Sequence, residues 1–241
     1  LIDMSLHKGE HHRMGAVVVC PFIPISGVSM KETVDLAHQL GKRVGNELLI
    51  PVYCYENAAK NNLRINLANC RSGEYEGLKN KLRDVKWKPD YGPNKFNETV
   101  AKFGAVAIGA RDFLVAYNIN LNTTSTRRAN SVAFDLREAG RVKREGGTLT
   151  GKIITDKNGE PVREPGYFKN LKGIGWYIEE YGVAQISYNI TNISTTPLHE
   201  VFSKTCDRAN SRGMRVTGSE LIGLVPKKVL IDAGKYFLRR Q

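Results

Sequence analysis

The sequence predicts an α/β fold, and the first observation behind this prediction is a strand–helix–strand pattern near the start. Residues 16–25 are almost all apolar, which predicts a strand that is buried on both faces. Ser29 and Glu32 form an S-x-x-E capping box, so a helix is expected to begin there. Residues 49–55 form a second apolar run, and strands that alternate with helices are typical of α/β proteins. The expected apolar side of the helix comprises Val34, Ala37, Leu40, Val44 and Leu48.

The second observation is a strand with one polar face in the latter half of the chain. Residues 113–121 alternate between apolar and polar side chains, which predicts a half-buried strand. Asn118 and Asn120 lie on its polar face, where they suit either the lining of a binding site or a solvated surface. Thr124 or Ser125 is expected to cap the helix that follows.

The third observation is that this strand–helix pattern occurs twice. The Tyr-Asn-Ile triplet at 117–119 precedes the helix just described, and the same triplet recurs at 188–190. After the second triplet, Thr196 and Pro197 are expected at the N-cap and the first helical position. We therefore expect a compact α/β subdomain from about Phe113 to the end of the chain.

The intervening segments carry turn and helix signals but no nucleotide-binding motif. A helix is expected around 74–82, and residues 87–97 form a loop by their proline and glycine content. The charged, glycine-rich segment 141–170 is expected to be a surface excursion with a hairpin tip at 158–159. The glycines of 172–176 do not complete a phosphate-loop pattern, so we expect them to permit close packing before the next strand.

Composition restricts the class of protein. The chain has 241 residues, of which 41% are hydrophobic and 25% charged, which is ordinary for a globular protein of one large or two small domains. No apolar run approaches the roughly 20 residues of a membrane helix. The net charge of +12 would suit a nucleic-acid partner, but the cations are spread along the chain without a nucleic-acid-binding motif, so small anionic ligands are expected instead. The four cysteines are scattered, which favours free thiols in a reducing compartment.

The segment 7–15, His-Lys-Gly-Glu-His-His-Arg-Met-Gly, concentrates proton-transfer chemistry. Its three histidines titrate near neutral pH, which suits them to acid–base catalysis. His7, Glu10 and His11 also match the H-x-x-E-H pattern of a zinc site, although Gly9 disfavours the helix which that motif needs. A solvated turn without catalytic function is the third interpretation.

The same segment and several later ones carry a family resemblance. The string LIDMSLHKGEHHRMGAVVVCPFIPISGVSM closely resembles the glutamate formimidoyltransferases (formiminotransferases), which are folate-dependent enzymes of histidine degradation. The resemblance continues in the same order along the whole chain. The later matching segments are RSGEYEGL at 71–78, GARDFLVAYNINL at 109–121, LREAGR at 136–141, GIGWYIE at 173–179 and GSELIGLVP at 218–226.

The resemblance implies a fold of two similar α/β subdomains with layered β-sheets inside and helices outside. Residues 1–111 would be the C-terminal part of the N-terminal subdomain, and 112–241 the C-terminal subdomain. The family has a further portion upstream of Leu1, so we expect a fragment that lacks the N-terminal start, with the first subdomain incomplete. His12 also departs from the family pattern, which usually has proline there.

The resemblance further implies transfer of the formimino group from N-formimino-L-glutamate to N5 of tetrahydrofolate, which acts as a co-substrate. His11 matches the catalytic histidine, whereas His7 and His12 would support it or be bystanders. Arg13 could hold a substrate carboxylate or pair with Glu10. The remaining substrate-binding residues would be Gly92, Pro93, Asn94, Lys95, Phe96 and Gly104 of the folate-binding loop, and Asp135.

The partners implied are formiminoglutamate and folate, in a cytoplasmic homodimer that binds no metal, nucleic acid or membrane. Two alternatives stay open at this point. One is a zinc-dependent hydrolase that uses His7 and His11. The other is a non-catalytic protein that binds folate or another anion.

Overall fold

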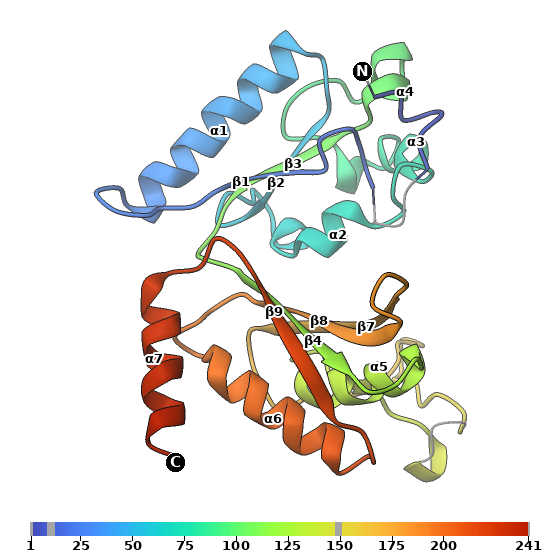
Figure 1. Ribbon diagram of the computed structural model, residues 1–241. Helices are drawn as coiled ribbons and strands as arrows, with labels where there is room; N and C mark the ends of the chain where they lie inside the picture. Colours follow the sequence, from blue (N-terminus) through green and yellow to red (C-terminus); the bar gives the residue numbers. More distant parts are fainter. Residues whose placement is uncertain (1, 9–12, 148–150, 241) are drawn as a thin grey trace. The chain divides into compact units, whose positions relative to one another are not determined.

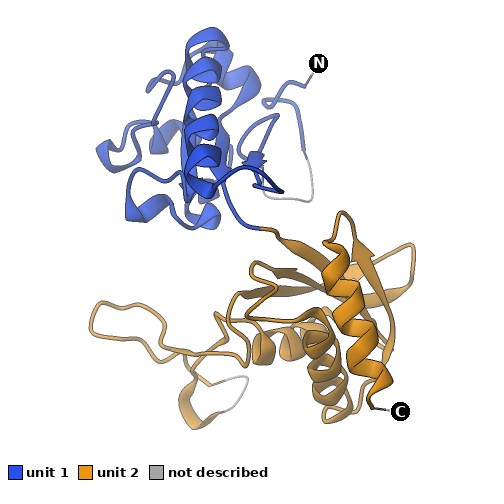
Figure 2. Cartoon of the chain, turned by 90° about the vertical axis from the view of Figure 1, so that its left-hand side faces the viewer, with its two compact units in different colours: residues 1–112 blue, residues 113–241 orange. Residues whose placement is uncertain are grey.

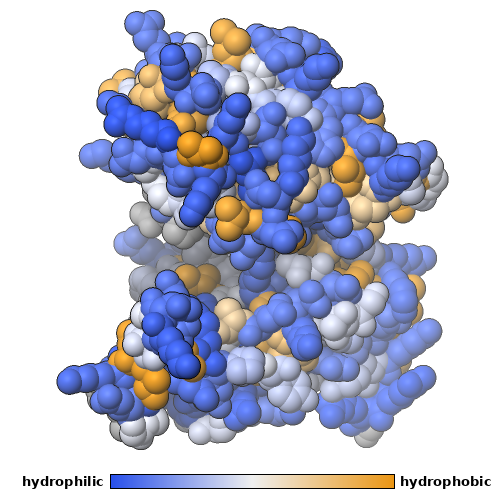
Figure 3. Space-filling view, turned by 180° about the vertical axis from the view of Figure 1, so that it is seen from behind, coloured by the Kyte–Doolittle hydropathy of each residue, from blue (hydrophilic) through white to orange (hydrophobic). Residues whose placement is uncertain are grey.

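The computed structural model describes residues 2–8, 13–147 and 151–240, and the chain divides into two compact units. The first unit comprises residues 1–112 and the second residues 113–241 (Figure 2). Each unit has its own sheet and its own hydrophobic core. The face seen in Figure 3 is mostly hydrophilic, with scattered hydrophobic side chains, as the charged composition leads one to expect.

The first unit contains a three-stranded parallel sheet in the order β1-β3-β2 (Figure 1). Each strand is followed by helical segments before the next one, and such crossovers produce parallel neighbours. Its elements are β1 (Val19–Phe22), α1 (Met30–Glu47), β2 (Val52–Glu56), η1 (Asn62–Arg64), α2 (Leu67–Arg71), α3 (Leu78–Lys81), η2 (Val85–Trp87), α4 (Glu98–Phe103) and β3 (Val106–Ala110).

Strand β1 forms within the expected apolar run, but the prediction that it is buried on both faces is wrong. It pairs only with β3 and so lies at an edge of the described sheet. None of its four residues is fully buried, and Val17 just before it is 60% exposed. A continuous apolar run therefore does not distinguish an edge strand from the fully covered central strand β3.

Helix α1 begins as predicted, because Ser29 and Glu32 form both hydrogen bonds of the capping box. Its buried residues, however, are Thr33, Ala37, Gly41 and Gly45, so only Ala37 of the expected apolar side is fully covered. Val34, Leu40 and Val44 pack partly against the core, and Leu48 is 56% exposed. The small residues form the buried stripe because Tyr91 and Gly92 approach the helix closely at Gly41 and Gly45. Leu40, Val44 and Leu48 instead line an apolar cavity of about 380 Å³.

The helix expected around 74–82 is shorter than predicted. It begins only at Leu78, because Gly77 turns back onto Gly73, whose carbonyl accepts a 2.6 Å hydrogen bond from the Gly77 amide. Gly73 and Glu74 both have positive φ, which does not fit a helix. The loop expected at 87–97 contains no helix or strand after Trp87, in agreement with its turn composition.

The second unit is a four-stranded antiparallel sheet in the order β7-β8-β4-β9, with helices packed on it (Figure 1). The inward residues Val115, Tyr117, Ile119 and Leu121 belong to the main core, so the predicted alternation is confirmed. The elements are β4 (Val115–Leu121), α5 (Thr126–Leu136), β5 (Arg141–Val142), η3 (Glu145–Gly147), β6 (Arg163–Glu164), β7 (Leu171–Ile178), β8 (Val183–Ile190), α6 (Leu198–Asn210), β9 (Val216–Ile222) and α7 (Lys227–Leu238).

The prediction of two α/β subdomains is confirmed, but the two sheets differ in strand direction. The first unit is parallel, whereas the hairpin of β7 and β8 and the antiparallel pairing of β4 with β8 and β9 make the second unit antiparallel. Ser125 caps α5 as one of the two predicted residues. Pro197, not Thr196, occupies the N-cap of α6, so that prediction is wrong by one position.

Glycines form the turn of the excursion and allow α5 to pack closely on β7. The tip at 158–159 is the predicted hairpin turn, with Gly159 at φ 82° and its amide bonded to Asp156. Gly173 and Gly175 lie inside β7 rather than before it, which corrects the prediction. A Cβ at Gly175 would lie 2.7 Å from the backbone nitrogen of Asn130, so glycine lets α5 lie directly on the strand.

Candidate functional site

The histidine-rich segment of the first unit is fixed at its end by Tyr75. The Tyr75 amide donates a 2.8 Å hydrogen bond to the Arg13 carbonyl, and Met14, the next residue, is fully buried. His7 is exposed, and its amide bonds to the Asp3 carbonyl at 3.0 Å. The predicted catalytic residue His11, and His12 beside it, lie outside the described residues, so the role of His11 stays a prediction.

The Arg13 guanidinium is partly paired and partly open. Its Nη2 lies 2.5 Å from a carboxylate oxygen of Glu76, and the guanidinium carbon lies 5.6 Å from the centre of the Tyr75 ring. The Arg13 side chain is only 15% exposed, and its buried Nη1 has no hydrogen-bond partner among the described residues. A buried unpaired donor is costly, so Nη1 has the capacity to bind one more oxygen. Glu10, the partner considered from the sequence, lies outside the described residues.

Tyr75 brings two of the predicted binding residues together. Its ring centre lies 6.4 Å from that of Phe96, and its hydroxyl donates a 2.5 Å hydrogen bond to the Ala101 carbonyl at α4. Arg13 lies on the same tyrosine, so Arg13, Tyr75 and Phe96 form one contiguous group. Tyr75 belongs to the matching segment 71–78, but the sequence patterns assign it no role. Its position between two carboxylates, Glu74 and Glu76, was the available signal.

The segment predicted as the folate loop is a loop only as far as Asn97, because helix α4 occupies Glu98–Phe103, which corrects the prediction. The two glycines at the ends of this segment have packing reasons for their identity. Gly104 has φ 71°, and a Cβ there would lie 2.4 Å from the Met14 carbonyl oxygen. Gly92 has φ 81°, and a Cβ there would lie 2.3 Å from the Ile50 carbonyl oxygen. The segment is therefore held at one end against Met14 and Gly15, which precede β1, and at the other against the entry to β2. Between these ends, Asn94 and Lys95 are exposed, and Pro93 is partly buried.

A buried ion pair holds the chain immediately before this loop. Arg64 Nη1 lies 2.6 Å from Asp90 Oδ2, and each side chain is only 4% exposed. The same carboxylate oxygen accepts a 2.7 Å hydrogen bond from the Cys54 amide of β2. Arg64 also donates to the Lys88 carbonyl at 2.5 Å, so residues 88–90 are tied to the sheet.

Asp135, the remaining predicted binding residue, lies on α5 in the second unit. Its two carboxylate oxygens pair with two different guanidinium groups, those of Arg141 and Arg212. The side chain is 14% exposed. Asp135 therefore holds two arginines in place, and its contact with folate stays a prediction.

The second unit also presents a hydrogen-bonded polar network on its sheet. Glu220 of β9 accepts hydrogen bonds from Tyr181 at 2.7 Å, Asn118 at 3.3 Å and Gln185 at 3.1 Å. Gln185 also donates to Asn120 at 2.8 Å. The bond from Tyr181, followed by those from Asn118 and Gln185, holds the pKa of Glu220 below its usual value. The sequence indicated the two asparagines, but it took the pairing of β8 and β9 with β4 to place Gln185 and Glu220 beside them.

The part of the chain that the structure describes shows neither a metal-ligand cluster nor a helix suited to a membrane. Within it, no three histidine, cysteine, aspartate or glutamate side chains gather as they would around a metal ion. His11, one of the two histidines of the zinc alternative, falls outside that part. Within the same residues, no helix has both the length and the apolar composition needed to cross a bilayer.

Comparison with known proteins gives matches over both units. Residues 1–111 match the family model described as formiminotransferase domain, N-terminal subdomain, and residues 116–241 match the one described as formiminotransferase domain. A formimidoyltransferase-cyclodeaminase of Gallus gallus is 44% identical over 241 residues, which are 100% of this chain and 40% of that protein. The chain therefore spans about two fifths of the length of that relative.

Two microbial relatives are covered more fully. A glutamate formimidoyltransferase of Streptococcus pyogenes serotype M1 is 38% identical over 238 residues, which are 99% of this chain and 70% of that protein. A glutamate formimidoyltransferase of Thermoplasma acidophilum is 39% identical over 241 residues, again 99% of this chain and 70% of that protein.

Proposed function

Because the chain belongs to the formiminotransferase family, we propose that it carries out formimino transfer from N-formimino-L-glutamate to N5 of tetrahydrofolate. The observation that carries the proposal is the match to both formiminotransferase subdomains, one on each unit. The products would be 5-formiminotetrahydrofolate and glutamate, in histidine degradation. We place the reaction in the cytoplasm and expect a homodimer, and the four free cysteine thiols support a reducing compartment.

The chemistry requires one proton to be taken and one to be given. N5 of tetrahydrofolate attacks the formimino carbon, and a tetrahedral intermediate forms with a new bond between N5 and that carbon. A base removes the proton from N5. An acid then protonates the glutamate nitrogen as its bond to the formimino carbon breaks. One imidazole can serve as base and then as acid, and such catalysis contributes about 10²–10⁴-fold.

We assign the proton transfers to His11 and the recognition of a glutamate carboxylate to Arg13. The support for Arg13 is its buried Nη1, which lacks a partner among the described residues while Nη2 is held by Glu76. A carboxylate that binds this open nitrogen would gain a charge-assisted hydrogen bond from a guanidinium that is already oriented. His7 is exposed and is given no role in the reaction.

For folate we assign the segment from Gly92 to Gly104, with Phe96 stacking on the pterin and Lys95 near the anionic tail. Phe96 is supported by its contact with Tyr75, which also contacts Arg13, so the ring lies near the proposed carboxylate site. Lys95 is exposed and unrestrained by any ion pair among the described residues, which suits a flexible cation that meets a mobile tail. We further propose that no metal ion takes part.

The experiment is a transfer assay on the complete protein with formiminoglutamate and tetrahydrofolate, in which released glutamate and the folate product are both measured. Stoichiometric formation of the two products is expected. Arg13→Lys keeps the charge but loses the planar fork, so we expect a raised KM for formiminoglutamate with a smaller change in kcat. Tetrahydrofolate binding without glutamate release would indicate a non-catalytic folate-binding protein. Loss of turnover on chelation, restored by zinc, would indicate the metal-dependent alternative.

A further inference from the structure

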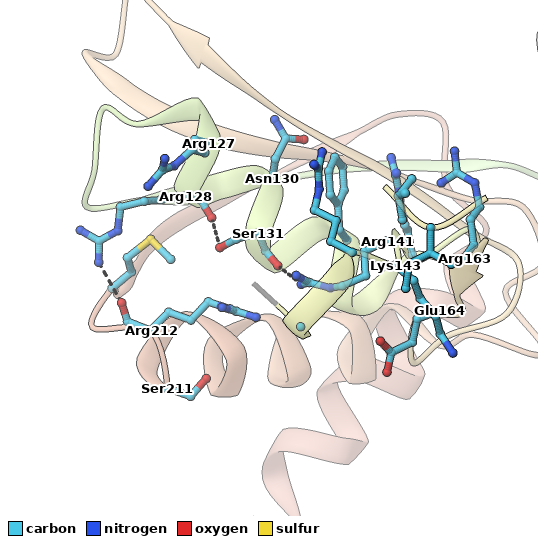
Figure 4. Close-up of a pocket in the computed structure, with 17 residues that line it drawn as sticks. Arg127, Arg128, Asn130, Ser131, Arg141, Lys143, Arg163, Glu164, Ser211 and Arg212 are labelled. Atoms are coloured by element: carbon cyan, nitrogen blue, oxygen red, sulfur yellow. Dashed lines mark hydrogen bonds between the residues drawn. The ribbon is translucent and has the colours of Figure 1, made fainter. Parts of the chain in front are cut away.

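The second unit contains a cavity of about 880 Å³ whose lining is dominated by arginine (Figure 4). Seven arginines and one lysine line it, against a single carboxylate, that of Glu164. They come from α5, from the turn after α6 and from the excursion that contains β5 and β6. We call this the arginine pocket. Like charges that gather in one cavity repel each other, so this arrangement costs stability unless an anion binds there.

Two of the arginines are fixed by the same carboxylate. Asp135 pairs through one oxygen with Arg141 and through the other with Arg212, and both guanidinium groups line the pocket. Arg141 also donates a 3.0 Å hydrogen bond to the Ser131 carbonyl, which Figure 4 shows as a dashed line. Both groups are held before any ligand arrives, which reduces the entropy lost on binding.

Two more arginines are held by backbone carbonyls and by an aromatic ring. Arg128 donates to the Arg212 carbonyl at 2.8 Å, which ties α5 to the turn after α6. Arg137 lies with its guanidinium carbon 3.8 Å from the centre of the Phe134 ring and donates to the Gly173 carbonyl at 3.2 Å. Burial lowers the pKa of Arg137, and the neighbouring charge of Arg163 lowers it further.

Three cations of the pocket remain available. Arg127, Lys143 and Arg163 are exposed, and none of them forms an ion pair with a carboxylate within the described ranges 2–8, 13–147 and 151–240. The pocket therefore combines guanidinium groups that are held in position with cations that no described carboxylate neutralises. The first kind gives geometric selection of a ligand, and the second gives electrostatic attraction.

The geometry points to a binding site for a small molecule that bears at least two phosphate groups. Guanidinium forks match the oxygens of phosphate, and arginine outnumbers lysine seven to one in this pocket. A phosphate group carries about −1.5 to −2 charges at neutral pH, so two or three of them offset much of the excess positive charge within one small ligand. The volume falls within the range of about 300–1,000 Å³ found for small-molecule sites.

The inference does not depend on the proposed transfer chemistry, because it is argued only from the residues that line the pocket. Its one link to the predicted folate contacts is Asp135, which holds Arg141 and Arg212. A chain of carboxylates carries only one charge per group, so a much longer ligand would be needed to balance the same cations in the same volume. A nucleic acid would need a broad basic surface, since such interfaces bury about 1,000–2,500 Å² of protein, whereas these cations converge on one concave site.

The test is a calorimetric titration of the complete protein with inorganic tripolyphosphate. The pocket variant Arg127→Ala/Arg163→Ala removes two cations that hold no other part of the fold through an ion pair among the described residues. The matched control Lys172→Ala/Lys227→Ala removes two exposed cations of the same unit that do not line the pocket. Both variants change the net charge equally. Arg127→Lys/Arg163→Lys keeps the charge and removes only the forks.

We expect the pocket variant to bind tripolyphosphate at least about tenfold more weakly than wild type, and the control to bind within about twofold. The lysine variant should lie between them. Adenosine triphosphate is titrated in parallel: tighter binding than tripolyphosphate would support a nucleotide as the source of the phosphates, and equal binding would support the phosphates alone.

Four results would overturn the inference. The first two are no binding of either phosphate probe, and equal weakening of binding in the pocket variant and the control. The other two are tighter binding of penta-γ-glutamate than of tripolyphosphate, and tighter binding of a short RNA than of either phosphate probe. Circular dichroism of each variant ensures that lost binding is not lost folding.

Discussion

Asp90 and Arg64 form the ion pair from which the largest stability effect in the first unit is expected. Their closest nitrogen and oxygen atoms lie 2.6 Å apart, and each side chain is only 4% exposed. Asp90→Ala would leave the Arg64 charge buried with the Lys88 carbonyl as its remaining hydrogen-bond acceptor among the described residues. The Cys54 amide would also lose the acceptor that it now contacts at 2.7 Å.

Removing one partner of a buried ion pair costs about 3–5 kcal/mol, because an uncompensated charge stays in the interior. With a urea dependence of about 1–3 kcal/mol per molar, the unfolding midpoint of the first unit should fall by roughly 1–5 M. Asp90→Asn keeps an oxygen for the Cys54 amide and removes only the charge, so it should lose less. Asp90 lies two residues before Gly92, so folate affinity should fall together with stability.

The assay is urea denaturation followed by the fluorescence of Trp87, in a Trp176→Phe background, so that the signal reports on the first unit. Glu47→Ala is the matched control. Glu47 pairs with Arg43 on the surface, where the two side chains are 56% and 70% exposed, and loss of such a pair costs only about 0.3–0.5 kcal/mol. If Asp90→Ala costs no more than Glu47→Ala, the reasoning about the buried pair is refuted.

Three further predictions concern the second unit. Hydrogen bonds from Tyr181 and two neighbouring amides lower the pKa of Glu220, so they stabilise the fold above the ordinary carboxyl pKa. Wild type should therefore lose stability relative to Glu220→Gln as the pH falls from about 5 through the lowered pKa. A difference in melting temperature between the two proteins that does not change with pH would contradict this. Gly175→Ala should lower the melting temperature, because its Cβ would lie 2.7 Å from a backbone nitrogen of α5, whereas Gly218→Ala, with 4.0 Å to the nearest atom, should change it little. Gly234→Ala should stabilise the unit by up to about 1 kcal/mol in urea denaturation, because α7 gains a better helix former with nothing within 4 Å of the new Cβ, and a loss of stability would contradict this.

Local signals in the sequence predicted where elements begin and which face is buried. The capping box at Ser29 and the N-cap at Ser125 depend on side chains within three residues, so a pattern in the sequence is sufficient to find them. The alternation in β4 likewise reports directly on its buried face. Packing between residues that are far apart in the sequence could not be predicted from such local patterns. The buried stripe of α1 consists of small residues because Tyr91 and Gly92 approach it, and those residues lie far along the chain.

The same distinction holds for the candidate site. The resemblance selected Arg13 and Phe96, and the structure brings both onto Tyr75, which no local pattern singled out. Asp135 was selected as a folate contact, but the partners that hold it, Arg141 and Arg212, become its neighbours only when α5, β5 and the end of α6 fold together. The concentration of positive charge in the arginine pocket could not be predicted for the same reason, since its cations are spread along the sequence from Arg127 to Arg212.

The central claim is that His11 transfers the proton in a formimino transfer to tetrahydrofolate, and a comparison of His11→Ala with His7→Ala in the complete protein tests it most directly. A proton shuttle acts in the transition state, so His11→Ala should lower kcat by about 10²–10⁴-fold while the Kd for tetrahydrofolate stays unchanged. His7→Ala, the matched loss of a nearby imidazole, should retain most of the turnover. Near-normal turnover in His11→Ala, or an equal loss in both variants, would contradict the claim.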